Sequence, residues 1–245
     1  MLTNEEKTRY ARQIILPEIG KKGQEKLKAS KVLIIGAGGL GSPSAMYLAC
    51  AGVGTIGILD DDIISISNLQ RQILHSSNRI GMKKVDSARQ TIVGLNPNVS
   101  VETHDIKLSG ESAENVIGMY DLVVDAVDNL ETRYIVNDTC QELKKPLIEG
   151  GVMHFDGMIL TVLPGKGPCF RCIFPQPPPK KDPREIGVLA AIPGIIGCME
   201  AVEAIKVLLD IGDPLVGRLL LLDGLEMIWH EVKVSRDPNC ISCSR

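Results

Sequence analysis

The sequence predicts an α/β fold: a doubly wound, Rossmann-like, mostly parallel sheet that continues into C-terminal antiparallel strands. The first observation is that short apolar, β-branched runs alternate with helical segments through about 150 residues, which is typical of a parallel sheet with helices on both faces. The second is that the chain after residue 150 loses this alternation and places its strands around one long helix.

Apolar runs bounded by glycine, proline or aspartate predict five strands in the first half. They lie at residues 32–35, 55–59, 99–104, 121–127 and 146–149. Helices are predicted at 40–51, 82–95 and 131–143, after an N-terminal helical arm over 4–27. In the second half we expect strands at 157–163 and 218–234 and a helix at 193–209. A segment rich in proline, lysine and aspartate, 174–187, indicates an exposed crossover loop.

Composition excludes several classes of protein. Apolar residues are 44% of the 245 and charged residues 23%, as in an ordinary globular chain. The net charge is −3, which gives no general affinity for nucleic acid or anionic lipid. The opening MLTNEEKTRY does not resemble a secretory signal, and apolar stretches end well short of a membrane span. We therefore expect a cytoplasmic protein that binds no membrane.

A glycine-rich turn follows the first predicted strand. Gly36, Gly38 and Gly41 fit the G-x-G-x-x-G pattern between a strand and a helix, where glycine lets the backbone approach a phosphate and the helix N-terminus offers N–H groups. Asp60 ends the next strand. Its distance along the chain from the glycines is typical of a carboxylate that accepts hydrogen bonds from ribose hydroxyls. This pattern predicts a nucleotide site and leaves ATP and NAD open.

Three charged residues favour ATP. Arg71 and Lys84 supply cations that a triphosphate needs and a dehydrogenase does not. Asp128 follows a strand, where a carboxylate suits Mg²⁺. Taken singly, each has an ordinary structural alternative: the two cations as solvated surface charges, and Asp128 as the cap of the helix that follows it.

Together these segments resemble a known family. GAGGLGSP, LDDD, SNLQRQ, Lys84 and VDAVDN are similar to the MoeB/ThiF/HesA adenylyltransferases, relatives of the ubiquitin-activating enzymes. The resemblance runs from RYARQI near the N-terminus to the last cysteine pair. It implies that residues 1–245 form a single domain, with an arm at 1–28, a nucleotide-binding half at 29–150 and a carrier-docking half at 151–245.

The resemblance also implies roles by position. Catalytic charges would come from Arg12, Arg71, Lys84 and Asp128, with Asp128 holding Mg²⁺. Arg12 would reach the partner's site in a homodimer. ATP would contact Gly36, Gly38, Gly39, Leu40, Gly41, Asp60, Asp62, Ser67, Asn68, Leu69, Gln70, Arg71, Lys84, Asp128 and Asn129.

The implied reaction is adenylylation of the C-terminal glycine of a ubiquitin-fold sulfur carrier ending in Gly-Gly, for molybdopterin or thiamine biosynthesis. Some members hold their carrier covalently through a crossover-loop cysteine. This loop has none, and Pro183 lies near that place. Sulfur is therefore expected from a separate donor such as a cysteine desulfurase. An oxidoreductase, activation of a tRNA base or peptide, and a non-catalytic scaffold are the alternatives.

The chain has seven cysteines, four of them in two Cys-x-x-Cys pairs. Four thiolates suit a structural, tetrahedral Zn²⁺, which we prefer to a redox pair or to free thiols. The expected ligands are Cys169, Cys172, Cys240 and Cys243.

Three cysteines remain outside these pairs. Cys50 and Cys140 fall in predicted helices and are expected to be buried and inert. Cys198 lies early in the long helix, where we expect packing rather than nucleophilic chemistry.

Overall fold

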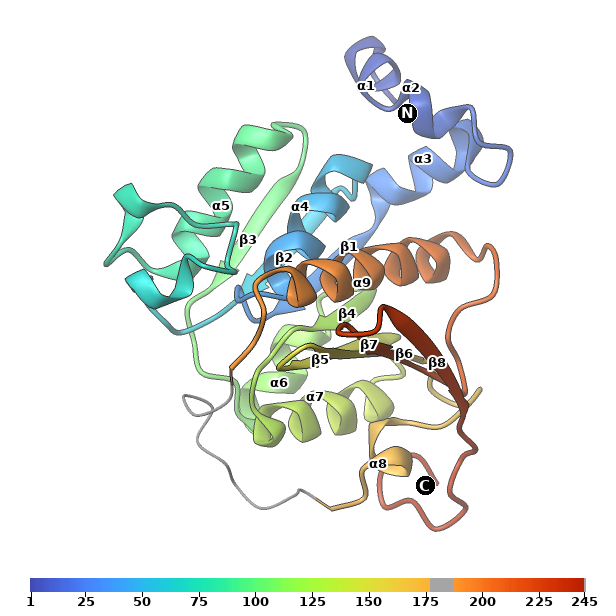
Figure 1. Cartoon of the computed structure of the whole chain (residues 1–245). Helices are drawn as coiled ribbons and strands as arrows, with labels where there is room; N and C mark the ends of the chain where they lie inside the picture. Colours follow the sequence, from blue (N-terminus) through green and yellow to red (C-terminus); the bar gives the residue numbers. More distant parts are fainter. Residues whose placement is uncertain (177–186, 245) are drawn as a thin grey trace.

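The computed structural model describes residues 1–176 and 187–244 and contains an eight-stranded sheet in the order β3-β2-β1-β4-β5-β6-β7-β8 (Figure 1). The strands are β1 (Lys31–Ile35), β2 (Thr55–Leu59), β3 (Ser100–His104), β4 (Leu122–Asp125), β5 (Leu147–Met153), β6 (Asp156–Val162), β7 (Arg218–Asp223) and β8 (Ile228–Lys233). Strands β1 to β5 are parallel, and β5 to β8 pair antiparallel. The predicted fold class is therefore confirmed.

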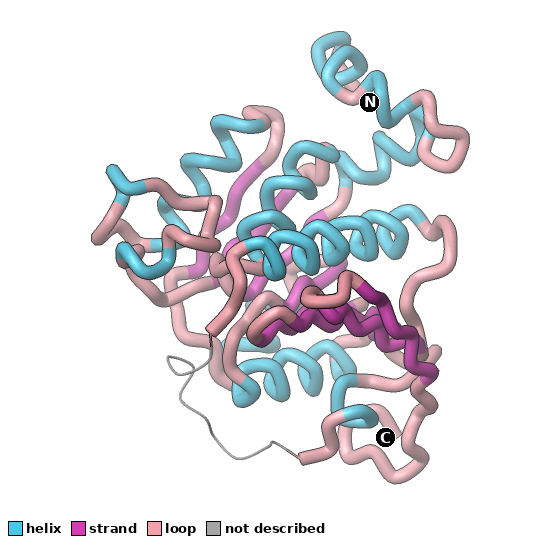
Figure 2. Tube along the Cα trace, viewed as in Figure 1, coloured by secondary structure: helices cyan, strands magenta, loops and turns pink. Residues whose placement is uncertain are grey.

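Helices cover both faces of the parallel strands (Figures 1 and 2). The helices are α1 (Asn4–Arg9), α2 (Ala11–Ile14), α3 (Gly20–Ala29), α4 (Gly41–Ala51), α5 (Lys84–Leu95), α6 (Gly110–Ile117), α7 (Leu130–Glu142), α8 (Phe170–Ile173) and α9 (Ala191–Leu209). Apolar side chains of α4, α5 and α9 form one core with the sheet, and those of α6 and α7 form another on the opposite face. Burying both faces explains the continuously apolar sequences of the central strands.

The structure extends or shifts some predicted elements. Helices α6 and α8 were not predicted. Strand β5 continues to Met153 rather than ending at Glu149, because it pairs with β6 along its whole length. Strand β4 ends at Asp125, two residues before the predicted end. Most of the expected crossover loop, including Pro183, lies outside the described residues. Within the described ranges, none of the helices is long and apolar enough to cross a membrane.

Candidate active site

The glycine loop connects β1 to α4. Gly36 has a positive φ of 101°, and a Cβ there would collide with the carbonyl of Ala126. A Cβ on Gly41 would collide with the carbonyl of Gly36, so only glycine allows this tight turn into the helix. The loop lies where strand order reverses between β1 and β4, which is where doubly wound sheets bind ligands.

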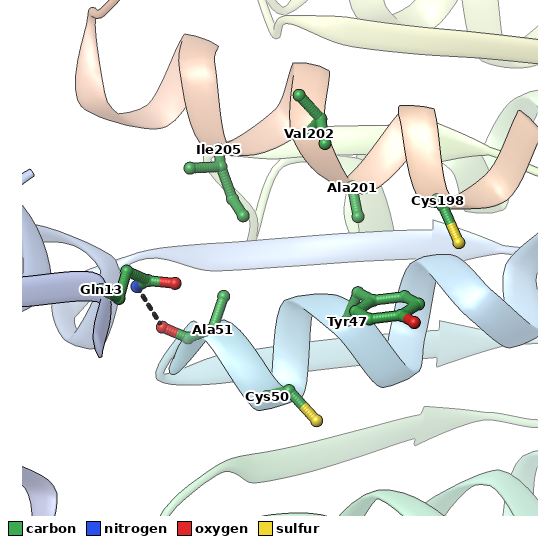
Figure 3. A pocket seen from close by; sticks show the side chains of 8 residues that line it. All are labelled: Gln13, Tyr47, Cys50, Ala51, Cys198, Ala201, Val202 and Ile205. Atoms are coloured by element: carbon green, nitrogen blue, oxygen red, sulfur yellow. Dashed lines mark hydrogen bonds between the residues drawn. The ribbon is translucent and has the colours of Figure 1, made fainter. Parts of the chain in front are cut away.

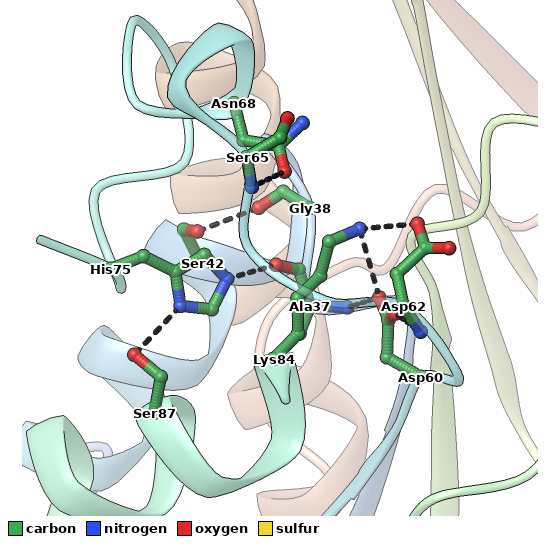
Figure 4. A network of polar contacts seen from close by, with 10 residues as sticks. All are labelled: Ala37, Gly38, Ser42, Asp60, Asp62, Ser65, Asn68, His75, Lys84 and Ser87. Atoms are coloured by element: carbon green, nitrogen blue, oxygen red, sulfur yellow. Dashed lines mark hydrogen bonds and ion pairs between the residues drawn. The ribbon is translucent and has the colours of Figure 1, made fainter. Parts of the chain in front are cut away.

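Asp60, at the end of β2, holds this loop in place. One carboxylate oxygen accepts the Ala37 N–H at 2.8 Å, and the other accepts the Asp62 N–H at 2.9 Å (Figure 4). The structure thus brings Asp60 to the glycine loop, as the sequence predicts. Its contact with a ribose stays a prediction.

Lys84 is the first residue of α5 and points back toward the loop (Figure 4). Its side chain is only 7% exposed, so the surface-charge alternative is wrong. The ammonium lies 2.7 Å from Asp62 and 3.6 Å from Asp60. Because the Asp62 side chain is 69% exposed, an anion that competes for Lys84 can displace it into water.

The SNLQRQ segment borders the same loop. The stem of Arg71 packs over Gly39, since a Cβ on this glycine would lie 3.3 Å from Arg71 Cγ. Ser67 and Asn68 form hydrogen bonds within the segment. The Ser67 carbonyl accepts a hydrogen bond from Arg71 Nη1 at 3.3 Å, and Asn68 Oδ1 accepts one from the Ser65 N–H at 3.0 Å. Leu69 is half-buried and Gln70 is exposed.

Asp128 and Asn129 follow β4, beside the glycine loop's strand. Asn129 Oδ1 accepts the Thr132 N–H at 2.9 Å and caps α7. The alternative that Asp128 caps this helix is therefore wrong. The Asp128 side chain is exposed, three residues beyond the end of the strand.

A buried histidine that the sequence analysis did not single out links the loop to α5. His75 Nε2 lies 2.9 Å from the Ala37 carbonyl, and Nδ1 lies 3.0 Å from Ser87 Oγ (Figure 4). Burial lowers the pKa of His75, so the ring is neutral at pH 7. A carbonyl can only accept, so Nε2 carries the proton. The His75 contacts fix the glycine loop relative to the helix that presents Lys84.

The sequence analysis also missed a buried charged cluster beneath the β4–α7 loop. Arg133 donates to Glu149 at 2.7 Å, and both side chains are almost fully buried. Burial and the neighbouring Asp125 raise the pKa of Glu149, and burial raises the pKa of Glu200 to about 8. Ser44 donates to Glu200 at 2.5 Å. Acidic residues inside apolar runs were the signal that could have revealed this cluster.

The two cysteine pairs meet at one point. Sγ–Sγ distances are 4.0 Å for Cys169–Cys172, 3.6 Å for Cys169–Cys240 and 3.4 Å for Cys172–Cys243. Zn–S bonds of about 2.3 Å give tetrahedral edges of about 3.8 Å, so this donor set fits Zn²⁺. The distances are far too long for disulfides.

The other cysteines and Arg12 lie outside the four-cysteine cluster. Cys140 is buried as predicted, but Cys50 is exposed, so the prediction that it is buried is wrong. Cys198 is half-buried well inside α9, and burial raises its pKa, which opposes a nucleophilic role. Cys50 and Cys198 line a groove between α4 and α9 (Figure 3). Arg12 is exposed on α2.

The loop, the buried lysine and the strand-end carboxylates define a doubly wound nucleotide-binding protein with an appended cysteine cluster. The profile of the ThiF family matches residues 10–242, and the chain belongs to this family.

Curated relatives include proteins named adenylyltransferase and sulfurtransferase MOCS3. The one from Culex quinquefasciatus is 47% identical over 247 residues, covering 99% of this chain and 56% of the relative. That from Drosophila yakuba is also 47% identical, covering 99% and 54%. The chain thus spans about half the length of these relatives.

Solved structures share the fold. E. coli MccB crystallised with ATP has a TM-score of 0.85 at 25% identity, covering 97% of this chain and 75% of that one. PaaA has a TM-score of 0.82 at 27% identity, covering 96% and 76%.

Proposed function

We propose that the chain is an adenylyltransferase that uses ATP to activate the C-terminal glycine carboxylate of a ubiquitin-fold sulfur carrier, releasing pyrophosphate. The observation that carries the proposal is the buried Lys84 ammonium at the glycine loop, with the Asp128 carboxylate at the adjacent strand end. A cation beside an acidic group suits a triphosphate with its metal better than a dinucleotide. The names of the MOCS3 relatives support this chemistry.

The chain's own residues act by positioning and charge. N–H groups at the start of α4 would hold phosphate oxygens, and Lys84 would exchange Asp62 for phosphate. Arg71, whose side-chain stem packs against Gly39, would add a second positive charge near the phosphates. Asp128 would hold Mg²⁺, which neutralises phosphate charge when bound. The substrate carboxylate is ionised at pH 7 and needs no general base. The other proposed ATP contacts are Asp60, Ser67, Asn68, Leu69, Gln70 and Asn129.

The carrier would dock on an open part of the sheet in the C-terminal half. Strand register places five apolar side chains on the face opposite α9, three of them exposed: Met153, Met158, Leu221, Ile228 and Val232. We name this set the open sheet face. Its apolar character suits a small folded domain, whose tail would then extend toward the strand ends beside Asp128.

A homodimer would complete the site with Arg12 from the second copy. The arm exposes Ile15 and Leu16, and the groove of Figure 3 adds exposed Tyr47 and Val202.

Arg12→Ala and Asp128→Ala, each inactive alone, should regain activity when mixed dimers form, because one site then holds both residues. Mixed subunits that stay inactive while dimeric would contradict the shared site.

Sulfur would then come from a separate persulfide donor such as a cysteine desulfurase, in a molybdopterin or thiamine pathway. The segment 174–187 contains no cysteine that could hold the carrier covalently.

The direct test is to incubate the protein with Mg·ATP and a carrier ending in Gly-Gly, then look for the carrier–AMP adduct by mass spectrometry. Adduct on the intact carrier, and none on a carrier lacking its last glycine, is the expected result. ATP-dependent modification of a peptide instead would move the substrate class to peptides.

A further inference from the structure

Buried side chains hold the backbone immediately before Asp128. The Val127 N–H donates to Asp125 Oδ1 at 3.1 Å, and the Val127 carbonyl accepts Arg133 Nη2 at 2.9 Å. Both backbone polar groups of Val127, its N–H and its carbonyl, therefore form hydrogen bonds with side chains from beneath the loop. On the other side of Asp128, Asn129 is fixed as the cap of α7.

Arg133 is itself tightly held. Its Nη1 donates to Glu149 Oε2 at 2.7 Å, with the two side chains 6% and 0% exposed. The guanidinium lies 5.5 Å from the centre of the Phe170 ring. Burying an arginine is costly unless it is paired and hydrogen-bonded, and here one terminal nitrogen donates to a carboxylate and the other to a loop carbonyl. An arginine placed only to neutralise buried acid would favour a bidentate pair with one carboxylate.

We propose that Arg133, supported by Glu149, is a positioning residue that holds the Val127 carbonyl and so presents the Asp128 carboxylate to the metal–nucleotide complex. The inference rests on the proposed function of Asp128. Mg²⁺ demands near-octahedral geometry, and a displacement of about 1 Å in a catalytic group can cost about 100-fold in rate. Because Val127 and Asn129 are both held by hydrogen bonds, the backbone of Asp128 between them is positioned with that precision.

We call the bonds from Arg133 to Glu149 and to the Val127 carbonyl the clamp. Two variants break it in different ways. Arg133→Lys keeps the charge but cannot bond Glu149 and Val127 in the same planar geometry. Glu149→Gln keeps the shape but weakens the hold on Arg133. Glu203→Gln is the matched control: Glu203 is equally a buried acid that accepts Thr161 and the Leu215 N–H, but it belongs to α9 and has no bond to the loop.

Two measurements test the clamp without relying on activity. Hydrogen exchange of the ligand-free protein should show the Val127 amide, which donates to Asp125, exchanging at least about tenfold faster in Arg133→Lys. Electron paramagnetic resonance with a non-hydrolysable ATP analogue should show Mn²⁺ binding about five- to tenfold more weakly, while metal-free affinity for the analogue is unchanged. Glu203→Gln should change neither.

Unchanged exchange and Mn²⁺ affinity in a folded Arg133→Lys protein would overturn the inference. If that variant does not fold, Glu149→Gln decides by the same two readouts. Wild-type protein that binds no Mn²⁺ with the analogue would remove the metal role of Asp128 and the inference with it. Wild-type protein that binds Mn²⁺ but modifies no carrier would leave the clamp standing and reject the proposed substrate.

Discussion

The two halves of the sheet bury their strands very differently. In the parallel half, β4 is buried at every position, and β1 at all but its first residue. In the antiparallel half, β8 is exposed at all six positions. Helices on both faces leave the parallel strands only their ends open to ligands, whereas β8 leaves its side chains open to solvent.

In the proposed function, the first half carries the chemistry and the second half recognises the carrier. Polar and charged groups gather at the carboxyl ends of β1, β2 and β4, where Lys84, Asp60 and Asp128 lie. Exposed apolar side chains gather on β8 and on the turns beside it. Substitutions in the first region should change catalysis at constant carrier affinity, and those in the second should do the reverse.

The largest effect is expected from Asp128→Ala in the parallel half. The side chain is exposed, so the fold should persist, while loss of the proposed metal ligand should slow adenylylation by about 100- to 1000-fold. Pyrophosphate release measures the rate, and an unchanged melting curve confirms the fold. A rate within a fewfold of wild type would remove Asp128 from the metal site.

Loss of one cysteine of the four-cysteine cluster, whose geometry fits Zn²⁺, should weaken the antiparallel half. Cys243→Ser should abolish bound zinc and free the C-terminal tail, at a cost on the order of 3 kcal/mol, or roughly 6–12 °C in Tm. Atomic absorption gives the zinc content and calorimetry the Tm. Cys198→Ser, outside the cluster, is the control. Full zinc content in the Cys243 variant would contradict the four-cysteine site.

Glu200 should make stability fall as pH rises. Burial raises the pKa of Glu200 to about 8, so the folded protein keeps a proton that the unfolded chain releases above the ordinary glutamate pKa of 4.5. Stability is then lost with rising pH between these values, by about 1.4 kcal/mol per pH unit. Glu200→Gln should remove this component, giving a flatter pH dependence of the free energy of unfolding. An identical slope in both proteins would show that Glu200 is ionised when folded.

The smallest effect is expected at the open sheet face. Ile228→Ser should raise the KM for the carrier about five- to tenfold, because one exposed apolar contact is lost, while kcat stays the same. Lys233→Ser, on the same strand but the other face, should leave the KM unchanged. Equal KM changes in both variants would place the carrier elsewhere.

Sequence patterns predicted the parallel half well because its strands and helices carry strong local signals. The open sheet face was harder to predict from the sequence. Strand β5 runs to Met153 only because β6 pairs with it, and local sequence patterns do not reveal that pairing. Helix α6 has apolar residues at helical spacing, Ala113, Val116 and Ile117, but is only eight residues long.

In the site, motifs predicted Asp60, Lys84 and the cysteine cluster. They missed His75, Arg133 and Glu149, whose roles depend on burial and on partners far along the chain. The exposure of Cys50 depends on which side of α4 faces solvent, which helix propensity does not fix.

ATP–pyrophosphate exchange with Gly-Gly carriers from the same genome is the most direct test of the central claim, with Asp128→Ala as control. We predict exchange that depends on one carrier and on Mg²⁺ and is lost in the variant. Absence of exchange with every carrier, in protein that binds ATP, would contradict carrier activation; protein that binds NADH and not ATP would contradict the nucleotide assignment itself.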